Sequence, residues 1–187
     1  EFIFEQFIEG DEIIVTGFAQ NFHYHLISVH DRIAADKPPF IDLQHRFPSR
    51  YAHLASSIQQ IHEQICMRLQ LSDTPIVSEW KVVADRIYLV ELSAQIPGEH
   101  VADFVIPKGL RYDYFANLVR LTLGEKIEPV SDKHVHPVRV KYWAENPGYG
   151  EWQEETSKAA FARVINANPP KIISSNLDRY GVAGFLD

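Results

Sequence analysis

The sequence is poor in the features that mark several large classes of protein. Its single cysteine, Cys66, excludes a disulfide within the chain and is compatible with the reducing cytosol. No apolar run approaches the roughly 20 residues of a membrane-spanning helix, and we recognise no signal peptide. Lysine and arginine are scattered and the net charge is −7, so we expect no basic surface for nucleic acid. We therefore predict a cytoplasmic protein that binds neither membranes nor nucleic acids.

The remaining composition is that of an ordinary globular protein. The 187 residues are 45% hydrophobic and 23% charged, which suffices for one domain or for one domain with a small appendage. Residues 1–4 have the apolar pattern of a strand, with no polar lead-in. We interpret this start as a piece of a longer protein, with a cloning remnant at residues 1–2 as the alternative.

Hydrophobic periodicity predicts both strands and a long helix in the first part of the chain. Apolar runs at 13–19 and 24–29 indicate a strand pair joined at 20–23. From Leu54 to Leu69, apolar residues recur at helical spacing, which predicts one long amphipathic helix. The spacing of the apolar residues therefore changes from that of a strand before residue 30 to that of a helix after residue 53.

The later part of the chain has shorter predicted elements. A second helix is expected over 112–123, ended by Gly124. Beyond it the pattern predicts strands at 138–143, 171–174 and 181–186, and a short helix at 159–164. We place a boundary near Lys126, which separates residues 1–125 from a smaller, mostly β cap at 126–187.

Two glutamates are predicted to face each other across a hairpin. Strand-like runs flank a three-residue turn at 84–86, which places Glu79 opposite Glu91 and Lys81 opposite Leu89. Side chains alternate along a strand, so both carboxylates point from one face. At about 5 Å and an effective dielectric constant near 20, they repel by roughly 3 kcal/mol. Divalent cations take such oxygen ligands, so we interpret the pair as a metal site. The alternative is an exposed hairpin with two solvated glutamates.

Four stretches of sequence carry a resemblance to a known family. They are the acidic ends and glycine of residues 5–12, the acid, imidazole and guanidinium of 42–49, the glutamate hairpin, and the loop at 90–98. In this order and spacing they resemble the C-terminal half of an ATP-grasp enzyme, a carboxylate–amine ligase. Residues 178–182 are similar to the closing strand of such ligases' small C-terminal domain. The resemblance implies an α+β fold, in which an ATP-grasp C-terminal lobe of antiparallel sheet and flanking helices precedes the β-rich cap.

The resemblance implies roles for residues that would hold the nucleoside. Glu5 and Ile8 match the hinge that meets the adenine, partly through backbone groups. Glu12 matches the acid that takes the ribose hydroxyls, for which an acceptor-only carboxylate is suited.

Other residues match the metal and acceptor sites of the family. Glu79 and Glu91 match the carboxylates that hold Mg²⁺, or alternatively Mn²⁺, on the phosphates of ATP. Ser93 occupies a position where the family commonly has a metal-binding Asn. Lys81 is expected to contact phosphate or to screen the glutamates. A further pair, Asp42 and His45, resembles the acid–histidine pair near the amine substrate of amino-acid ligases, and we assign it the catalytic role.

The sequence also departs from the family pattern. Gln95 stands where amino-acid ligases typically have an arginine that clamps a substrate carboxylate. Glu99 stands where the loop often has a second glycine, which places a negative charge near a site for anions. We interpret the chain as lacking the lobe that would precede residue 1 and carry the phosphate-binding lysines. We expect the chain alone to be inactive unless another segment supplies that lobe in cis or in trans.

Three functions are kept open. The first is a fragment of an ATP-dependent ligase that forms an acyl phosphate from a small carboxylate and passes it to an amine, with a homodimer as one assembly. The second is a non-catalytic ATP-grasp-like module that binds a protein partner, and the third is a piece of a biotin-dependent carboxylase. We interpret Arg32 and Arg46 as surface charges. The histidine pairs His23/His25 and His134/His136 are interpreted as structural or solvated.

Overall fold

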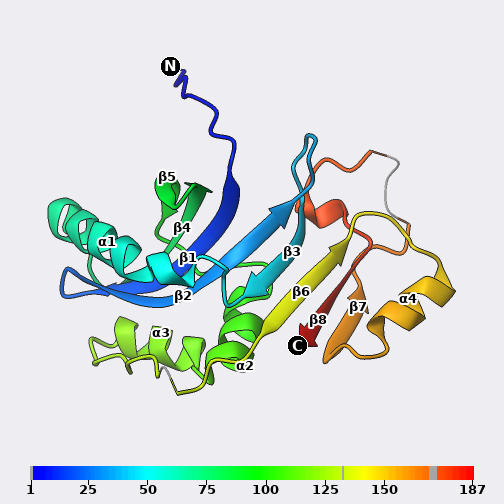
Figure 1. Ribbon diagram of the computed structural model, residues 1–187. Coiled ribbons are helices and arrows are strands. Elements are labelled where there is room, and N and C mark those ends of the chain that lie inside the picture. The colour runs from blue at the N-terminus through cyan, green and yellow to red at the C-terminus, as the bar shows by residue number, and fades with distance from the viewer. Residues whose placement is uncertain (1, 132, 169–171) are drawn as a thin grey trace.

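One antiparallel sheet organises the chain, of which the computed structural model describes residues 2–131, 133–168 and 172–187 (Figure 1). Its eight described strands lie in the order β5-β4-β1-β2-β3-β6-β8-β7. Their bounds are β1 Asp11–Gln20, β2 His23–Ala34, β3 Asp42–Phe47, β4 Thr74–Val83, β5 Arg86–Ser93, β6 Val138–Trp143, β7 Phe161–Val164 and β8 Gly181–Leu186. The sheet and its flanking helices confirm the predicted α+β class.

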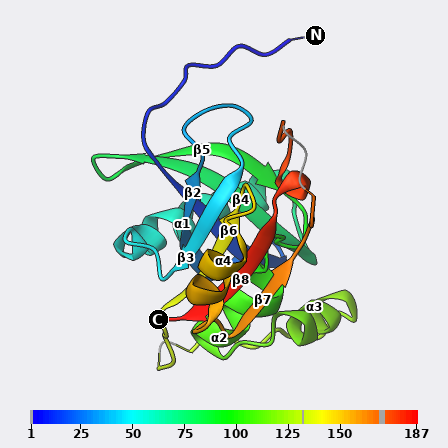
Figure 2. The same ribbon diagram turned by 90° about the vertical axis from the view of Figure 1, so that its right-hand side faces the viewer.

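Helices cover both faces of this sheet (Figures 1 and 2). The helices are α1 Ala55–Leu69, α2 Ile106–Leu110, α3 Tyr114–Thr122 and α4 Tyr149–Thr156, and a π-helical turn at Val101–Val105 precedes α2. Alternation along the strands divides the core between the two faces. Ile13 and Val15 pack with Ile58 of α1, whereas Phe18 packs with Tyr114 and Leu121 of α3. None of the described helices has the length and apolar character needed to cross a membrane.

The long amphipathic helix is confirmed as α1, although its buried stripe differs from the predicted one. The fully buried positions are Ile58, His62 and Cys66, which are spaced by four residues, whereas Leu69 is 65% exposed. His62 is held on both sides because its Nδ1 lies 2.9 Å from the Ile58 carbonyl oxygen and its Nε2 lies 2.8 Å from Ser78 Oγ. A polar side chain therefore occupies the centre of the helix interface, which hydrophobic periodicity alone does not reveal.

The glutamate hairpin has the predicted pairing but a different turn. Glu79 lies opposite Glu91, as predicted, whereas Lys81 lies opposite Tyr88 and not Leu89. The turn contains two residues at positive φ, which suits a tight hairpin of type I′ geometry. A β-bulge then adds Val90 to β5, and this extra residue restores the facing of the glutamates.

Several predicted elements are wrong. Residues 2–9 pair with no described strand, so the strand expected over 1–4 does not form at 2–4, where Phe2 and Phe4 are 89% and 94% exposed; residue 1 lies outside the described residues. Both ribbon views show this segment projecting away from the sheet (Figures 1 and 2). The helix expected at 159–164 is β7, which pairs with β8 and so follows its partner rather than local propensity. Residues 172–174 form no strand, and Lys171 lies outside the described residues.

The sheet continues across the predicted boundary at residue 125. Strand β3 pairs with β6, so the later strands extend the same hydrogen-bonded ladder as the earlier ones. Strands β6 and β8 were predicted with the bounds that they have, Val138–Trp143 and Gly181–Leu186. The division into 1–125 and 126–187 stays a prediction.

We predict that the stability of the fold falls in mild acid because of His62. Burial lowers the pKa of His62, so the folded state keeps this imidazole neutral while the unfolded chain protonates it near its ordinary value of about 6.5. The stabilising contribution is therefore complete above pH 6.5 and is lost as the pH falls below it. Urea unfolding at pH 7.5 and 5.5 should show a smaller pH effect in His62→Gln than in the wild type. Equal pH effects in both proteins would contradict the prediction.

Candidate functional site

Charged side chains gather on one half of one sheet face, away from the residues that pack against α2 and α3. Residues that face each other across paired strands project from the same face of the sheet. In the observed register, Glu12 faces both Lys81 of β4 and Arg32 of β2, and Arg32 in turn faces His45 of β3. The glutamate pair joins this face because Glu79 lies two residues before Lys81 on β4. The structure thus brings most of the predicted site residues together on five adjacent strands.

Arg32 lies at the centre of this group, although the sequence analysis interpreted it as a surface charge. Its Nε lies 2.5 Å from Asp42 Oδ1, and its Nη1 lies 3.1 Å from Glu79 Oε2 and 3.2 Å from Glu12 Oε2. Burial lowers the pKa of Arg32, but the carboxylates of these neighbours, above all that of Asp42, raise it above its ordinary value. The guanidinium is therefore a permanent cation that joins three acids.

A β-bulge explains why Arg32 was missed. The 20–23 turn continued in plain register would place Asp31 opposite Glu12, but a bulge beside Gly17 shifts the pairing by one residue to Arg32. Gly17 was the available signal, since a glycine within a strand often marks a bulge or a close approach. A Cβ at this position would lie 2.4 Å from the ring of Tyr24, so the close approach is real. Arg46 faces Asp31 and binds its carboxylate at 2.6 Å, on the opposite face from Arg32.

Asp42 and His45 lie beside each other as predicted, with 3.8 Å between Asp42 Oδ2 and His45 Nε2. Asp42 is only 4% exposed, and Asn176 both donates to its Oδ2 at 3.0 Å and accepts from its backbone N–H at 2.8 Å. Burial raises the pKa of Asp42, but the neighbouring His45 and Arg32 outweigh burial and hold it well below its ordinary value. Asp42 is therefore an ionised, fixed side chain.

The C-terminal segment contributes two further residues that the sequence analysis did not predict. Asn176 contacts Asp42 across 134 residues of sequence, and Arg179 donates to the Asp42 carbonyl oxygen at 3.1 Å. Arg179 also lies over the ring of Tyr142, at 3.8 Å from its centroid, and pairs with Glu99. The carboxylate of Glu99 is thus neutralised by an ion pair with a buried arginine. No local pattern in the sequence signals contacts of this separation.

The glutamate pair lies at the edge of the group. Burial raises the pKa of Glu79, with Arg32 acting against the shift and Glu91 adding to it. Ser93 Oγ donates to Glu91 Oε1 at 2.8 Å, so the predicted third ligand touches the pair. Within the described ranges there is no group of three or more His, Cys, Asp or Glu side chains arranged to hold a metal ion. Two carboxylates and a hydroxyl are hard oxygen donors, which suits an ion that also shares phosphate ligands, such as Mg²⁺.

The remaining predicted residues differ in position. Lys81 Nζ lies 2.6 Å from Glu12 Oε1, within the charged group. Glu5 is exposed and Ile8 half-buried in the projecting segment, and no hydrogen bond or ion pair joins Glu5 to the described chain. This segment approaches the group through Phe7, whose ring centroid is 5.8 Å from Lys81 Nζ. The structure therefore brings Glu12 and Lys81 to the site, and leaves Glu5 outside it.

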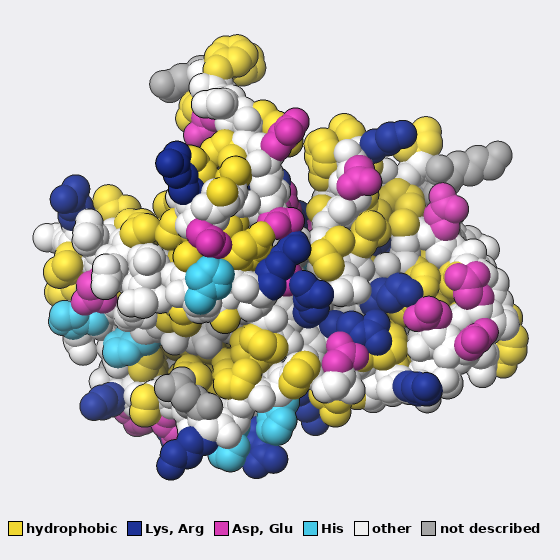
Figure 3. Space-filling model, viewed as in Figure 1, with side chains coloured by type: hydrophobic (Ala, Val, Ile, Leu, Met, Phe, Trp, Pro, Cys, Tyr) yellow, Lys and Arg dark blue, Asp and Glu magenta, His cyan; other side chains and the backbone are white. Residues whose placement is uncertain are grey.

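One face of the described chain carries charged side chains of both signs. Figure 3 shows acidic and basic side chains interspersed over one face of the described chain, with hydrophobic side chains on the projecting segment. A small cavity of about 20 Å³ is lined by Glu12, Arg32, Glu79 and Lys81, with Val90 at its side. The charged group is thus packed closely, with room for about one water molecule.

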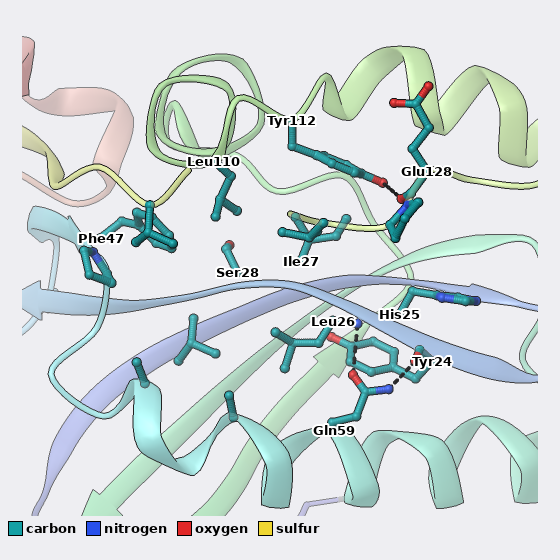
Figure 4. Close-up of a pocket in the computed structure, with 17 residues that line it drawn as sticks. Tyr24, His25, Leu26, Ile27, Ser28, Phe47, Gln59, Leu110, Tyr112 and Glu128 are labelled. Atoms are coloured by element: carbon teal, nitrogen blue, oxygen red, sulfur yellow. Dashed lines mark hydrogen bonds between the residues drawn. The ribbon is translucent and has the colours of Figure 1, made fainter. Parts of the chain in front are cut away.

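A larger pocket, of about 450 Å³, lies along residues 24–29 of β2, the part of this strand that β3 does not pair with (Figure 4). Leu110 and Tyr112 face Ile27 across it, and Gln59 of α1 lies on its other side. Gln59 Oε1 accepts from the Leu26 N–H at 3.1 Å, so this side chain takes the place of a neighbouring strand. None of the predicted site residues lines this pocket.

Comparison with known proteins identifies the family. The model of the ATP-grasp domain matches residues 1–103, more than half of the chain. The chain belongs to the ATP-grasp family. Residues 1–103 contain all five strands that carry the charged group, so the family match and the candidate site coincide. The predicted resemblance is confirmed.

Solved structures support the same ATP-grasp fold at low sequence identity. Phosphoribosylglycinamide synthetase from Anaerococcus prevotii has a TM-score of 0.72 at 14% identity, covering 96% of this chain and 49% of that one. L-amino acid ligase from Bacillus licheniformis has a TM-score of 0.68 at 16% identity, with 96% and 49% covered. N5-carboxyaminoimidazole synthetase from Staphylococcus aureus, complexed with ADP, has a TM-score of 0.65 at 12% identity, covering 95% of this chain and 46% of that one. The ATP-grasp chain spans about half the length of these structures. No curated protein matches its sequence.

We predict that Asp42→Asn destabilises the ATP-grasp chain by about 2 kcal/mol, because a partly buried Arg32 loses its shortest ion pair. Urea unfolding at pH 7 measures this change. Asp187→Asn is the matched control, since Asp187 pairs with Arg139 at 2.9 Å on the surface, where such pairs contribute about 0–1 kcal/mol. A loss for Asp42→Asn no greater than that of the control would show that the buried network contributes little.

Proposed function

We propose that this chain is one part of an ATP-dependent carboxylate–amine ligase that binds Mg-ATP and forms an acyl phosphate. The observation that carries the proposal is the facing of Glu79 and Glu91, on the same sheet face as Glu12, in an ATP-grasp fold. Two carboxylates that lie directly opposite are destabilising unless a cation compensates for their repulsion. A divalent cation bound by Glu79 and Glu91 would compensate for this repulsion.

Glu79 and Glu91 are the residues proposed to hold Mg²⁺, with Mn²⁺ as the alternative ion. One oxygen of each carboxylate already accepts a hydrogen bond within the protein. Arg32 donates to Glu79 Oε2, and Ser93 donates to Glu91 Oε1. Neither Glu79 Oε1 nor Glu91 Oε2 has a hydrogen-bond partner in the described chain, so one oxygen of each is available to a ligand. The ion would neutralise the phosphate oxygens of ATP, and the chain's part is to fix its two carboxylate ligands.

The nucleoside is proposed to lie beside Glu12 and Lys81. Glu12 Oε2 is buried without a hydrogen-bond partner among the described residues, even though Arg32 lies 3.2 Å away. An acceptor in this condition suits a ribose hydroxyl, which can donate to it. Lys81, which pairs with Glu12, is proposed to meet a phosphate, and Glu5 and Ile8 belong to the segment that would lie along the adenine.

Asp42 and His45 are the residues proposed to face the acceptor amine. In the proposed reaction, a carboxylate oxygen of the substrate attacks the γ-phosphorus of ATP and ADP leaves. The amine then attacks the acyl carbon and displaces phosphate. The fixed carboxylate of Asp42 suits a positioning role for the imidazole of His45, whose nitrogens have no hydrogen-bond partner in the described structure. An unpartnered imidazole can hold the proton that the attacking amine loses.

The other wall of the ATP site is proposed to come from a different segment, in cis or in trans. The chain covers about half of the solved structures that it resembles, among them one complexed with ADP. In this proposal residues 1–125 are the C-terminal lobe and residues 126–187 a small subdomain that holds Asp42 through Asn176. The isolated chain then binds nucleotide weakly and does not turn over.

A second candidate function is a non-catalytic module that binds a protein partner. Two observations favour it. Gln95 is exposed and uncharged, so it cannot clamp a substrate carboxylate as an arginine does. The projecting segment exposes Phe2, Phe4 and Phe7, which suit contact with another polypeptide.

We predict that the chain binds Mn²⁺ through Glu91, so that Glu91→Gln weakens binding at least tenfold. Titration of free Mn²⁺ by electron paramagnetic resonance measures the affinity. Glu151→Gln is the control, because it makes the same charge change at an exposed position in the first turn of α4. Equal Mn²⁺ affinity in Glu91→Gln and Glu151→Gln would remove the metal assignment.

We also predict that Glu91→Ala abolishes ATP hydrolysis in the natural polypeptide or assembly that contains both walls of the site. The reason is the loss of the ligand that positions the metal on the phosphates. Circular dichroism should show unchanged folding, since Glu91 is an exposed strand residue. If Mg-ATP neither shifts the melting temperature nor is hydrolysed by the intact protein, the non-catalytic module is the better account.

A further inference from the structure

We propose that Arg32 is an internal counter-cation of the metal site, which holds Glu79 Oε2 and opposes the binding of a divalent cation to the free oxygen, Oε1, of the same carboxylate. This inference rests on the proposed function, and it adds a residue that lowers the metal affinity of this particular chain. Arg32 acts on the metal through Glu79, so it is a positioning residue rather than a ligand.

The charges of the group show what is left for a cation to neutralise. Four carboxylates, on Glu12, Asp42, Glu79 and Glu91, are accompanied by the two cations Arg32 and Lys81. Two negative charges therefore remain, which one divalent cation balances. Arg32 already supplies part of that compensation at Glu79, at an Nη1–Oε2 distance of 3.1 Å.

Arg32 can release Glu79 without losing its other partners. Its Nε is bound to Asp42, which is itself held by Asn176, so the base of the guanidinium is anchored. The single Nη1 is shared between Glu79 at 3.1 Å and Glu12 at 3.2 Å. Of these two carboxylates, Glu79 is the more exposed, with 38% of its side chain accessible against 27% for Glu12. A cation that binds Glu79 Oε1 can leave all three ion pairs of Arg32 in place, and one that takes both oxygens of Glu79 breaks one pair and leaves two.

The remaining guanidinium charge would still lie close to the bound cation. Arg32 contacts the carboxylate of Glu79, which is also a proposed metal ligand. The bound cation and the guanidinium would therefore lie beside the same carboxylate. Repulsion between a divalent cation and a unit charge at about 6 Å, even at the dielectric constant of water, corresponds to about a tenfold change in affinity. Removal of Arg32 should therefore tighten metal binding.

The experiment is titration of the 187-residue chain with Mn²⁺, followed by electron paramagnetic resonance, in the wild type, Arg32→Gln and Arg46→Gln. Arg46 is a matched control, because it pairs with the buried Asp31 on the opposite sheet face and its replacement makes the same charge change. We expect about tenfold tighter binding in Arg32→Gln and wild-type affinity in Arg46→Gln. Adding Glu91→Gln to Arg32→Gln should abolish the gain, which places the effect at the proposed site.

Contrary outcomes are distinguishable from failure of the proposed function. If the wild type binds Mn²⁺ through Glu91 but Arg32→Gln binds no more tightly, the role of Arg32 is overturned and the metal site stands. If neither protein shows binding that depends on Glu91, the metal site itself is wrong and the inference falls with it. Should Arg32→Gln fail to fold, Arg32→Gln combined with Asp42→Asn removes both members of the buried pair. That double variant should then bind Mn²⁺ more tightly than Asp42→Asn alone, and equal affinity would overturn the inference.

Discussion

The register of five neighbouring strands, β5-β4-β1-β2-β3, is the constraint on which the candidate site depends. Antiparallel pairing decides which side chains share a face, and a shift of one residue moves a side chain to the other face. Two bulges set this register. The bulge beside Gly17 brings Arg32 opposite Glu12, and the extra residue Val90 brings Glu91 opposite Glu79. Without them, both charged residues would point from the wrong face and the group would not form.

The charged group is stable only as a network. Burying a single carboxylate is costly, but a buried pair with good geometry and further hydrogen bonds can be tolerated. Asp42 meets this condition through Arg32 and Asn176, and Arg179 extends the network to Glu99. Arg32 is shared among three carboxylates, so that loss of one acid leaves this cation with two acidic partners. This sharing allows a site with several buried charges to exchange one contact without losing the rest.

The departures from the family pattern have different structural consequences. Glu99, which the sequence places near a site for anions, is bound by Arg179 and so presents no free charge there. Gln95 has no such compensation, because it is exposed on the loop after β5 and brings no positive charge. The two departures therefore differ in structure, because Glu99 has an ion-pair partner within the fold, whereas Gln95 is exposed and uncharged.

The sequence by itself determined the strand pair and the long helix, because these depend on local periodicity. It placed Glu79 opposite Glu91 through a three-residue turn, whereas the structure reaches the same facing through a two-residue turn and the extra residue Val90. It also carried the family, through motifs whose order and spacing resemble ATP-grasp enzymes, and the ATP-grasp model matches residues 1–103. Only the tertiary structure decided the place of Arg32 and the contact of Asn176 with Asp42. The first depends on a bulge, whose position is set by close packing at Gly17, and the second joins residues 134 positions apart. Contacts of this kind are determined by how separate elements pack, and no local periodicity encodes them.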